Sequence, residues 1–161
     1  MKKLLLTILI GIGVLLGVIF VAAYFQKQGK QTFINEKREG KVDVLIGESV
    51  IYLELADTPE KRAMGLSAKP KIPMDEGMLF SFEQKDVIPQ FWMKGMLIPL
   101  DFIWINDNKI VQINENVQPP KGEDDIITIT PNAAVDYVIE ANAGYLLKND
   151  IKIGDAVKIN F

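Results

Sequence analysis

The chain has 161 residues, 18 of them basic and 21 acidic, and a formal net charge of −3. It contains no cysteine and no histidine, which excludes disulfides, thiolate nucleophiles and thiolate or imidazole metal ligands. The acidic balance argues against a nucleic-acid partner, because binding to phosphates requires a basic surface.

The first 25 residues differ from the rest of the chain. Lys2 and Lys3 precede an uncharged apolar run, residues 4–25, which as a helix would span roughly 33 Å, enough to cross the core of a bilayer. The run predicts one N-terminal transmembrane helix, and the basic residues before it place the following domain outside the cytoplasm. Residues 21–23 (Val-Ala-Ala) resemble a cleavage site, and cleavage there would give a secreted protein.

Two segments follow the predicted anchor. Residues 26–40 (QKQGKQTFINEKREG) are polar and contain glycines, which is typical of a linker. Residues 41–161 have the length of a single domain with one hydrophobic core. Beyond residue 25 the chain has 16 basic and 21 acidic residues, and therefore a charge of −5.

The start of this domain predicts a hairpin and then a helix. Residues 42–46 lead through Gly47-Glu48-Ser49 into residues 50–55, in which Ile51, Leu53 and Leu55 alternate with Tyr52 and Glu54, the pattern of a half-buried pair of strands. The sequence Asp57-Thr58-Pro59-Glu60 predicts a short helix that ends near Gly65, because Asp or Thr caps a helix and Pro favours its first turn.

The remainder of the domain predicts more short strands. Residues 102–105 and 110–114 flank Asn106-Asp107-Asn108-Lys109, in which Asn and Asp tolerate the positive φ of a tight hairpin turn. Residues 144–149 predict a second short helix. Many short strands at close spacing favour a mostly β (α+β) domain, barrel-like or sandwich-like, with one or two short helices. The other predicted strands are 77–82, 88–93, 126–130, 135–141 and 156–160.

One segment, residues 91–101 (FWMKGMLIPLD), joins two apolar runs through a Lys, a Gly and a Pro and ends on an acid. Pro99 cannot donate to a sheet ladder, so Asp101 is expected at the start of a strand. Together with the sequences EGMLF (76–80), RAMGL (62–66) and NEN (114–116), this segment resembles the DUF192 family.

Further short sequences match the same family, namely Asn142-Ala143-Gly144 and Gly154-Asp155. Gly95 and Met96 stand where the family usually has Asn-Thr, and the Tyr and Ser that it often carries near residues 129–131 are missing. The resemblance implies a compact, barrel-like β domain with minor helices and no assigned biochemical role.

Five residues are candidate ligand-binding residues, because small-ligand sites combine large apolar walls with a few convergent polar groups. Trp92 would supply a wall, and Lys94, Asp101 and Glu115, with Arg62, would supply polar groups. Structural interpretations stay open: Trp92 as a core residue, and Lys94 with Asp101 as a partly buried ion pair. We predict no catalytic residue, metal ligand or cofactor.

Three functions stay open. The first is a non-catalytic, membrane-tethered module that binds an unknown small molecule, glycan or protein. The second is a carboxylate-dependent hydrolase acting on an envelope polymer, for which the sequence offers acids but no indication that two face each other across a cleft. The third is a structural accessory protein of a membrane complex. The lack of an activated nucleophile favours a non-enzymatic role. The acids that the sequence offers for a hydrolase are Asp75, Glu76, Asp101, Glu115 and Glu140.

Overall fold

The computed structural model describes residues 17–21, 38–122 and 125–161. The chain divides into two units, residues 1–37 and 38–161. In the first unit residues 17–21 are helical, and the rest of the predicted anchor and most of the predicted linker lie outside the described residues. Among the residues that the structure describes, no helix has the length and apolar character needed to span a bilayer.

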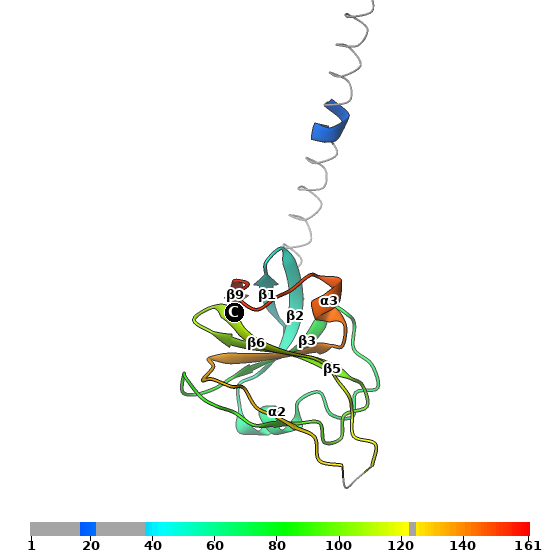
Figure 1. Ribbon diagram of the computed structural model, residues 1–161, viewed down its shortest axis with the longest axis vertical. Coiled ribbons are helices and arrows are strands. Elements are labelled where there is room, and N and C mark those ends of the chain that lie inside the picture. Colours follow the sequence, from blue (N-terminus) through cyan, green and yellow to red (C-terminus); the bar gives the residue numbers. More distant parts are fainter. Residues whose placement is uncertain (1–16, 22–37, 123–124) are drawn as a thin grey trace, which may run out of the picture. The chain divides into compact units, whose positions relative to one another are not determined.

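The second unit consists mainly of strands (Figure 1). Seven of them form one sheet in the order β6-β5-β8-β3-β2-β1-β9. A separate small sheet pairs β4 (Phe91–Trp92) with β7 (Thr128–Ile129), and the helices are α2 (Pro59–Met64) and α3 (Tyr145–Lys148). The mostly β prediction is therefore confirmed. The main-sheet strands are β1 (Val42–Ile46), β2 (Ser49–Ala56), β3 (Glu76–Ser81), β5 (Leu100–Asn106), β6 (Lys109–Val117), β8 (Tyr137–Asn142) and β9 (Val157–Asn160).

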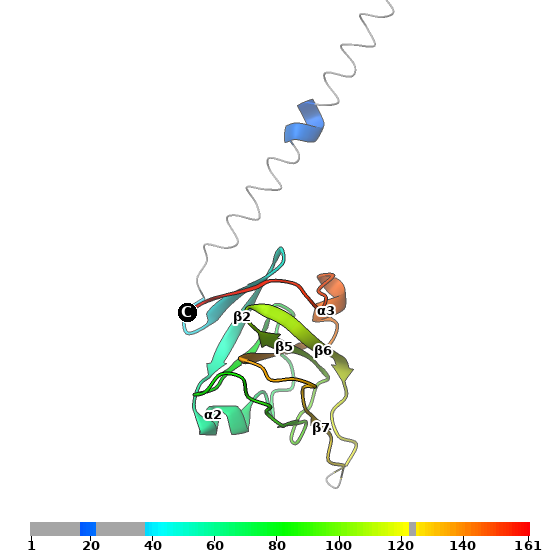
Figure 2. The same ribbon diagram turned by 60° about the vertical axis from the view of Figure 1, so that its left-hand side comes forward.

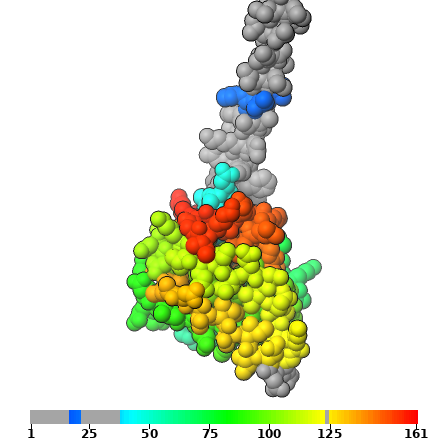
Figure 3. All heavy atoms as spheres, in the orientation of Figure 1, coloured from blue at the N-terminus to red at the C-terminus, as the bar shows by residue number. Residues whose placement is uncertain are grey.

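The main sheet curls into a half-barrel. In Figure 1, β1 and β2 run steeply while β6 crosses them. The two edges of the sheet approach each other where Lys109 of β6 forms a bridge with Ala156, and the Val157 N–H donates to the Asn108 carbonyl at 2.8 Å. Figure 3 shows the face formed largely by the C-terminal half of the chain, from β6 to β9.

Both faces of the central strands are buried, because successive side chains of a strand point to opposite sides of the sheet. Leu79 and Ile103 belong to one apolar cluster, whereas their neighbours Phe80 and Phe102 belong to a second cluster on the other face. Strands of this kind have nearly continuous apolar sequences, as β3 and β5 do. The elements α2 and β7 lie at one end of the unit, near the second cluster, and α3 lies at the opposite end (Figure 2).

The strand pairing follows from local sequence. Asp107 and Asn108 have φ values of 48° and 57°, and the predicted hairpin is confirmed, with Phe102 opposite Asn114. β2 and β3 are parallel, and their connection contains α2, because parallel neighbours need a crossover. At Gly77, a Cβ atom would lie 2.0 Å from the backbone oxygen of Glu140, so β3 and β8 can approach this closely only with glycine there.

Other predicted elements differ in length. The helix predicted from residue 59 is confirmed: the Thr58 side chain accepts from the Lys61 N–H, and the helix ends at Gly65. The strands predicted over 88–93 and 126–130 are reduced to the two-residue β4 and β7. Directly after these two residue pairs, the Met93 N–H still donates to the Ile127 carbonyl at 3.0 Å, but the regular pairing between β4 and β7 ends.

Candidate functional site

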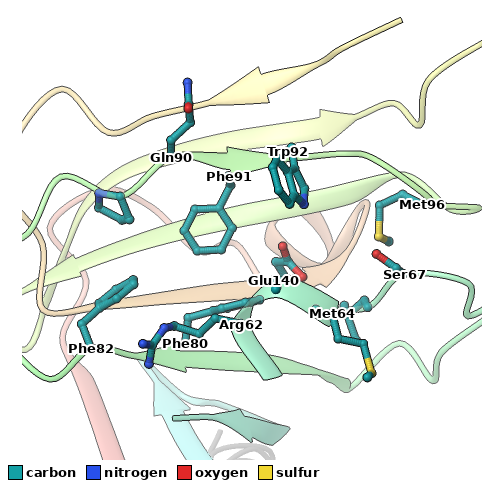
Figure 4. Close-up of a pocket in the computed structure, with 14 residues that line it drawn as sticks. Arg62, Met64, Ser67, Phe80, Phe82, Gln90, Phe91, Trp92, Met96 and Glu140 are labelled. Atoms are coloured by element: carbon teal, nitrogen blue, oxygen red, sulfur yellow. The ribbon is translucent and has the colours of Figure 1, made fainter. Parts of the chain in front are cut away.

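A pocket of about 260 Å³ lies between α2, β4 and the outer face of the main sheet. Its walls are largely aromatic, with Phe80 and Phe82 on one side and Phe91 and Trp92 of β4 on the other (Figure 4). We call it the aromatic pocket. Its lining is formed by residues 62–67, Phe80, Phe82, residues 89–92, Met96 and Glu140.

The β4 wall is held by ring contacts. Phe91 meets Phe80 edge-on, with 4.7 Å between ring centroids, and meets Trp104 in the same way at 5.5 Å. Such edge-to-face pairs add specific geometry to ordinary apolar burial. Trp92, the next residue, is 54% exposed. The ring of Phe91 is therefore held in place inside the pocket, whereas the indole of Trp92 faces solvent.

The pocket also contains a buried acid, Glu140 of β8. It is 5% exposed and lies between Met78 of β3 and Phe102 of β5 in the sheet. The Leu66 N–H hydrogen-bonds to this carboxyl group, but the Glu140 Oε2 atom has no partner among the described residues. Burial raises the pKa of Glu140 to about 8, and the bond from Leu66 opposes the rise. The side chain is therefore mainly protonated at neutral pH.

The sequence RAMGL (62–66) forms one side of the pocket. Gly65 ends α2 with φ 52°, a conformation that favours glycine, and it directs Leu66 towards the acid. A Cβ atom at Gly65 would lie 3.6 Å from both the Glu140 Oε2 atom and the Phe80 ring. The glycine therefore gives the turn its shape and leaves space beside the carboxyl group.

Arg62 is held at the other end of the pocket. Its Nη1 donates to the carbonyl oxygens of Asp57 and Ser81, both at 3.0 Å, and its guanidinium lies 5.8 Å from the Phe82 ring centroid. Figure 4 shows the guanidinium beside Phe82 and well apart from the Glu140 carboxyl group. Within the described lining, Arg62 and Glu140 are the ionisable side chains.

The structure brings together only some of the five predicted residues. Arg62 and Trp92 both line the aromatic pocket. Lys94 is exposed, and its carbonyl accepts from the Ser67 hydroxyl at 3.2 Å, which ties the β4 segment to the loop after α2. Glu115 is exposed on β6 and lines a separate hollow beside α3.

Asp101 has a structural environment instead. It is the second residue of β5, as expected for the start of a strand, and is 1% exposed. Its Oδ1 accepts from the Asn116 N–H at 2.8 Å and its Oδ2 from the Leu146 N–H at 3.1 Å. No ion pair joins it to Lys94 in the described part of the chain, so the ion-pair interpretation does not hold here.

Glu140 was not among the predicted ligand-binding residues, although the sequence carries a signal for it. It sits in the run Val138-Ile139-Glu140-Ala141, where both faces of the strand are apolar, so the acid has no polar face to occupy. It is the one carboxyl group in the described lining, and no cluster of three or more acids suited to a metal ion occurs among the described residues.

The sequence of this domain was compared with models of protein families. A family model, DUF192, described as Uncharacterized ACR, matches residues 42–159. The chain belongs to the DUF192 family. The half-barrel and the aromatic pocket described above are thus those of a DUF192 domain, and the resemblance found in the sequence is confirmed.

Two solved structures resemble this DUF192 chain. One, from Sinorhizobium meliloti and described as "a putative transcription regulator", is 31% identical with a TM-score of 0.65, covering 74% of this chain and 92% of its own. The other, a protein of unknown function from Novosphingobium aromaticivorans, is 30% identical with a TM-score of 0.67, covering 73% and 84%. A search of curated proteins found no match.

Proposed function

We propose that this DUF192 domain is a non-catalytic binding module that takes a small amphipathic molecule into the aromatic pocket. The observation that carries the proposal is the Glu140 Oε2 atom, buried without a partner inside an aromatic-walled pocket. Leaving a buried polar atom unpaired costs roughly 1–3 kcal/mol, which a polar group of a ligand would recover. Pockets with apolar walls and few polar groups are the usual form of a small-ligand site.

The dimensions of the pocket limit its ligand. Its volume of about 260 Å³ lies just below the roughly 300–1,000 Å³ of pockets for drug-sized compounds. At its mouth Trp92 and Met64 are 54% and 68% exposed, so a bound molecule would remove their apolar surface from water. These features support a compound with a compact apolar body and one polar end.

The other functions receive less support from the described residues. A hydrolase that uses two acids needs a second carboxyl group across the cleft from the first, and the described lining contains Glu140 alone. The description of the S. meliloti relative as a transcription regulator raises nucleic-acid binding as a further function, but the charge of this domain opposes it. Residues 38–161 contain 13 basic and 20 acidic residues, and therefore carry a net charge of −7.

We also propose that residues 4–25 anchor the chain in the cell membrane and that the DUF192 domain lies outside the cytoplasm. The support is the uncharged apolar sequence of that segment and the lysines before it. Protease added to intact cells should digest the domain, and N-terminal sequencing should find Met1 or Lys2. A domain protected in intact cells and digested only after lysis would refute the orientation.

Native mass spectrometry of the full chain in lipid nanodiscs tests the binding function. We expect an additional small-molecule mass on the wild type that Trp92→Ala loses. Leu147→Ala should retain it, because that side chain is 83% exposed on α3, outside the aromatic pocket. A mass retained in Trp92→Ala, or absent from all three proteins after incubation with cell extract, would refute the proposal.

A further inference from the structure

We infer that the ligand of the aromatic pocket is a small organic cation, an alkylammonium compound whose charged group lies against Glu140 and the rings of Phe91 and Trp92. This inference rests on the function proposed above and names the ligand class. It combines three features of the pocket: an acid without a cationic partner, aromatic rings beside that acid, and a fixed positive charge at the far end.

The first feature is the unpaired acid. Glu140 receives one hydrogen bond, from the Leu66 N–H, and its Oε2 atom receives none from the described residues. Its neighbours across the sheet are Met78 and Phe102, which carry no charge. Buried acids usually have a cation or several donors as partners, so a cation is what this environment lacks.

The second feature is the arrangement of rings around the acid. Figure 4 shows the Glu140 carboxyl group between Phe91 and the Trp92–Met96 side of the pocket. A cation over an aromatic face is stabilised by the ring quadrupole, most strongly by Trp, and quaternary ammonium groups are bound in this way. The contacts of Phe91 with Phe80 and Trp104 keep its ring in position before a ligand arrives.

The apolar lining distinguishes an organic cation from a metal ion. Hard metal ions require several oxygen ligands, whereas the described lining offers one carboxyl group, that of Glu140. Its other side-chain oxygens are the Gln90 amide and the Ser67 hydroxyl, which already donates to the Lys94 carbonyl. The methyl or methylene groups of an alkylammonium ion would instead contact the aromatic and other apolar side chains of the lining. The chemistry of the lining therefore matches a cation with an apolar surface.

The third feature is the charge distribution. Arg62 is the other charged group of the described lining, and its bonds to the carbonyls of Asp57 and Ser81 hold it beside Phe82. Repulsion from this guanidinium orients a cation towards the Glu140 end. The net charge of −7 on residues 38–161 raises the local concentration of cations around the domain.

Proton linkage follows from this pairing. A bound cation favours the ionised form of Glu140, so binding below pH 8 releases a proton, and affinity should rise with pH until the acid is ionised in the empty pocket. A neutral ligand that accepts a hydrogen bond from the protonated acid should show the opposite trend. The direction of the pH dependence therefore identifies the ligand class.

Calorimetry with matched probes tests the inference on the full chain. Choline and its uncharged isostere 3,3-dimethyl-1-butanol would be titrated between pH 6 and 9, in phosphatidylglycerol nanodiscs that contain no ammonium lipid. We expect choline to bind at least tenfold more tightly than the alcohol at pH 9. Its affinity should rise about tenfold per pH unit below pH 8 and then level off, with proton release seen in buffers of different ionisation enthalpy.

Variants separate failure of this inference from failure of the proposed function. Glu140→Gln, which keeps the shape of the side chain, should reduce choline binding to the level of the alcohol and remove its pH dependence, and Glu140→Asp should retain the dependence with weaker binding. Trp92→Ala should weaken both probes. Equal binding of choline and the alcohol, or choline affinity that falls with pH, would overturn the cation while leaving small-molecule binding in place. Binding of neither probe would overturn the cation, and the mass-spectrometry result then decides the proposed function.

Discussion

Replacing Glu140 with Gln should change how the stability of the ligand-free protein depends on pH. The pKa of Glu140 is raised from 4.5 to about 8 in the folded protein, so between these values the folded state binds a proton that the unfolded state has released. The contribution of this group to stability is therefore fully present below pH 4.5 and is lost as pH rises through 8.

The size of the effect follows from the two pKa values. At 1.36 kcal/mol per pKa unit, the full loss is roughly 5 kcal/mol, of which about 4 kcal/mol falls between pH 5 and pH 9. That is a large part of the roughly 5–15 kcal/mol that stabilises a typical domain. Glu140→Gln has no proton to lose, so it should lack this decline and become the more stable protein at pH 9.

Urea unfolding followed by circular dichroism, at one-unit steps from pH 5 to 9, measures the difference directly. Acids elsewhere, such as Glu76, whose pKa is lowered by Lys41 and Arg38 despite its partial burial, contribute equally to both proteins and cancel in the comparison. Parallel stability profiles for the wild type and Glu140→Gln would show that the carboxyl group is ionised in the folded protein at neutral pH. Glu140 would then not be a neutral acid in the aromatic pocket.

Three further substitutions, two of them paired with a control variant, test the roles of other residues through urea unfolding. Asp101→Asn should cost about 1–3 kcal/mol, because one of the two backbone N–H groups that donate to Asp101 would face an amide donor. Exposed Lys94→Met should change stability by less than about 0.5 kcal/mol, and similar losses in both variants would instead indicate an ion pair between the two side chains. Gly77→Ala should cost at least about 3 kcal/mol or prevent folding, since its Cβ meets backbone, while Gly122→Ala, with nothing within 4 Å, serves as the control and should be nearly neutral. Asn116→Val should cost about 1–3 kcal/mol because φ is 51° there, and an unchanged midpoint would contradict that assignment of strain.

The sequence predicts the strand-rich fold well because its signals are local. The β1–β2 hairpin, the Asp107-Asn108 turn and the Thr58-Pro59 helix start each depend on residues close together in the chain, and each is found, although the burial of β2 does not alternate. The short β4 and β7 were overestimated as longer strands. Phe91, Met93 and Ile129 pack in or against the second core cluster, so their apolar character reflects burial rather than pairing in a long ladder, whereas Trp92 is largely exposed.

The site was harder to predict because it depends on distant segments. Arg62 and Trp92 were selected for their chemistry, and the fold brings both to the aromatic pocket. Glu140 joins them only because β8 lies between β3 and β5, an order that no local pattern specifies. Conversely, Asp101 resembles a binding residue in the sequence, but its partners are backbone groups of β6 and α3, which a sequence does not reveal.

The bonds of Asp101 also have a consequence for hydrogen exchange. The amide protons of Asn116 and Leu146 belong to different parts of the chain, yet both end on one carboxylate that is 1% exposed. Neither proton can exchange with solvent until the ends of β5, β6 and α3 separate, so the two should exchange at similar, slow rates. A pair of amides so far apart in the sequence would then act as one reporter, showing whether this end of the half-barrel opens locally or only when the whole domain unfolds.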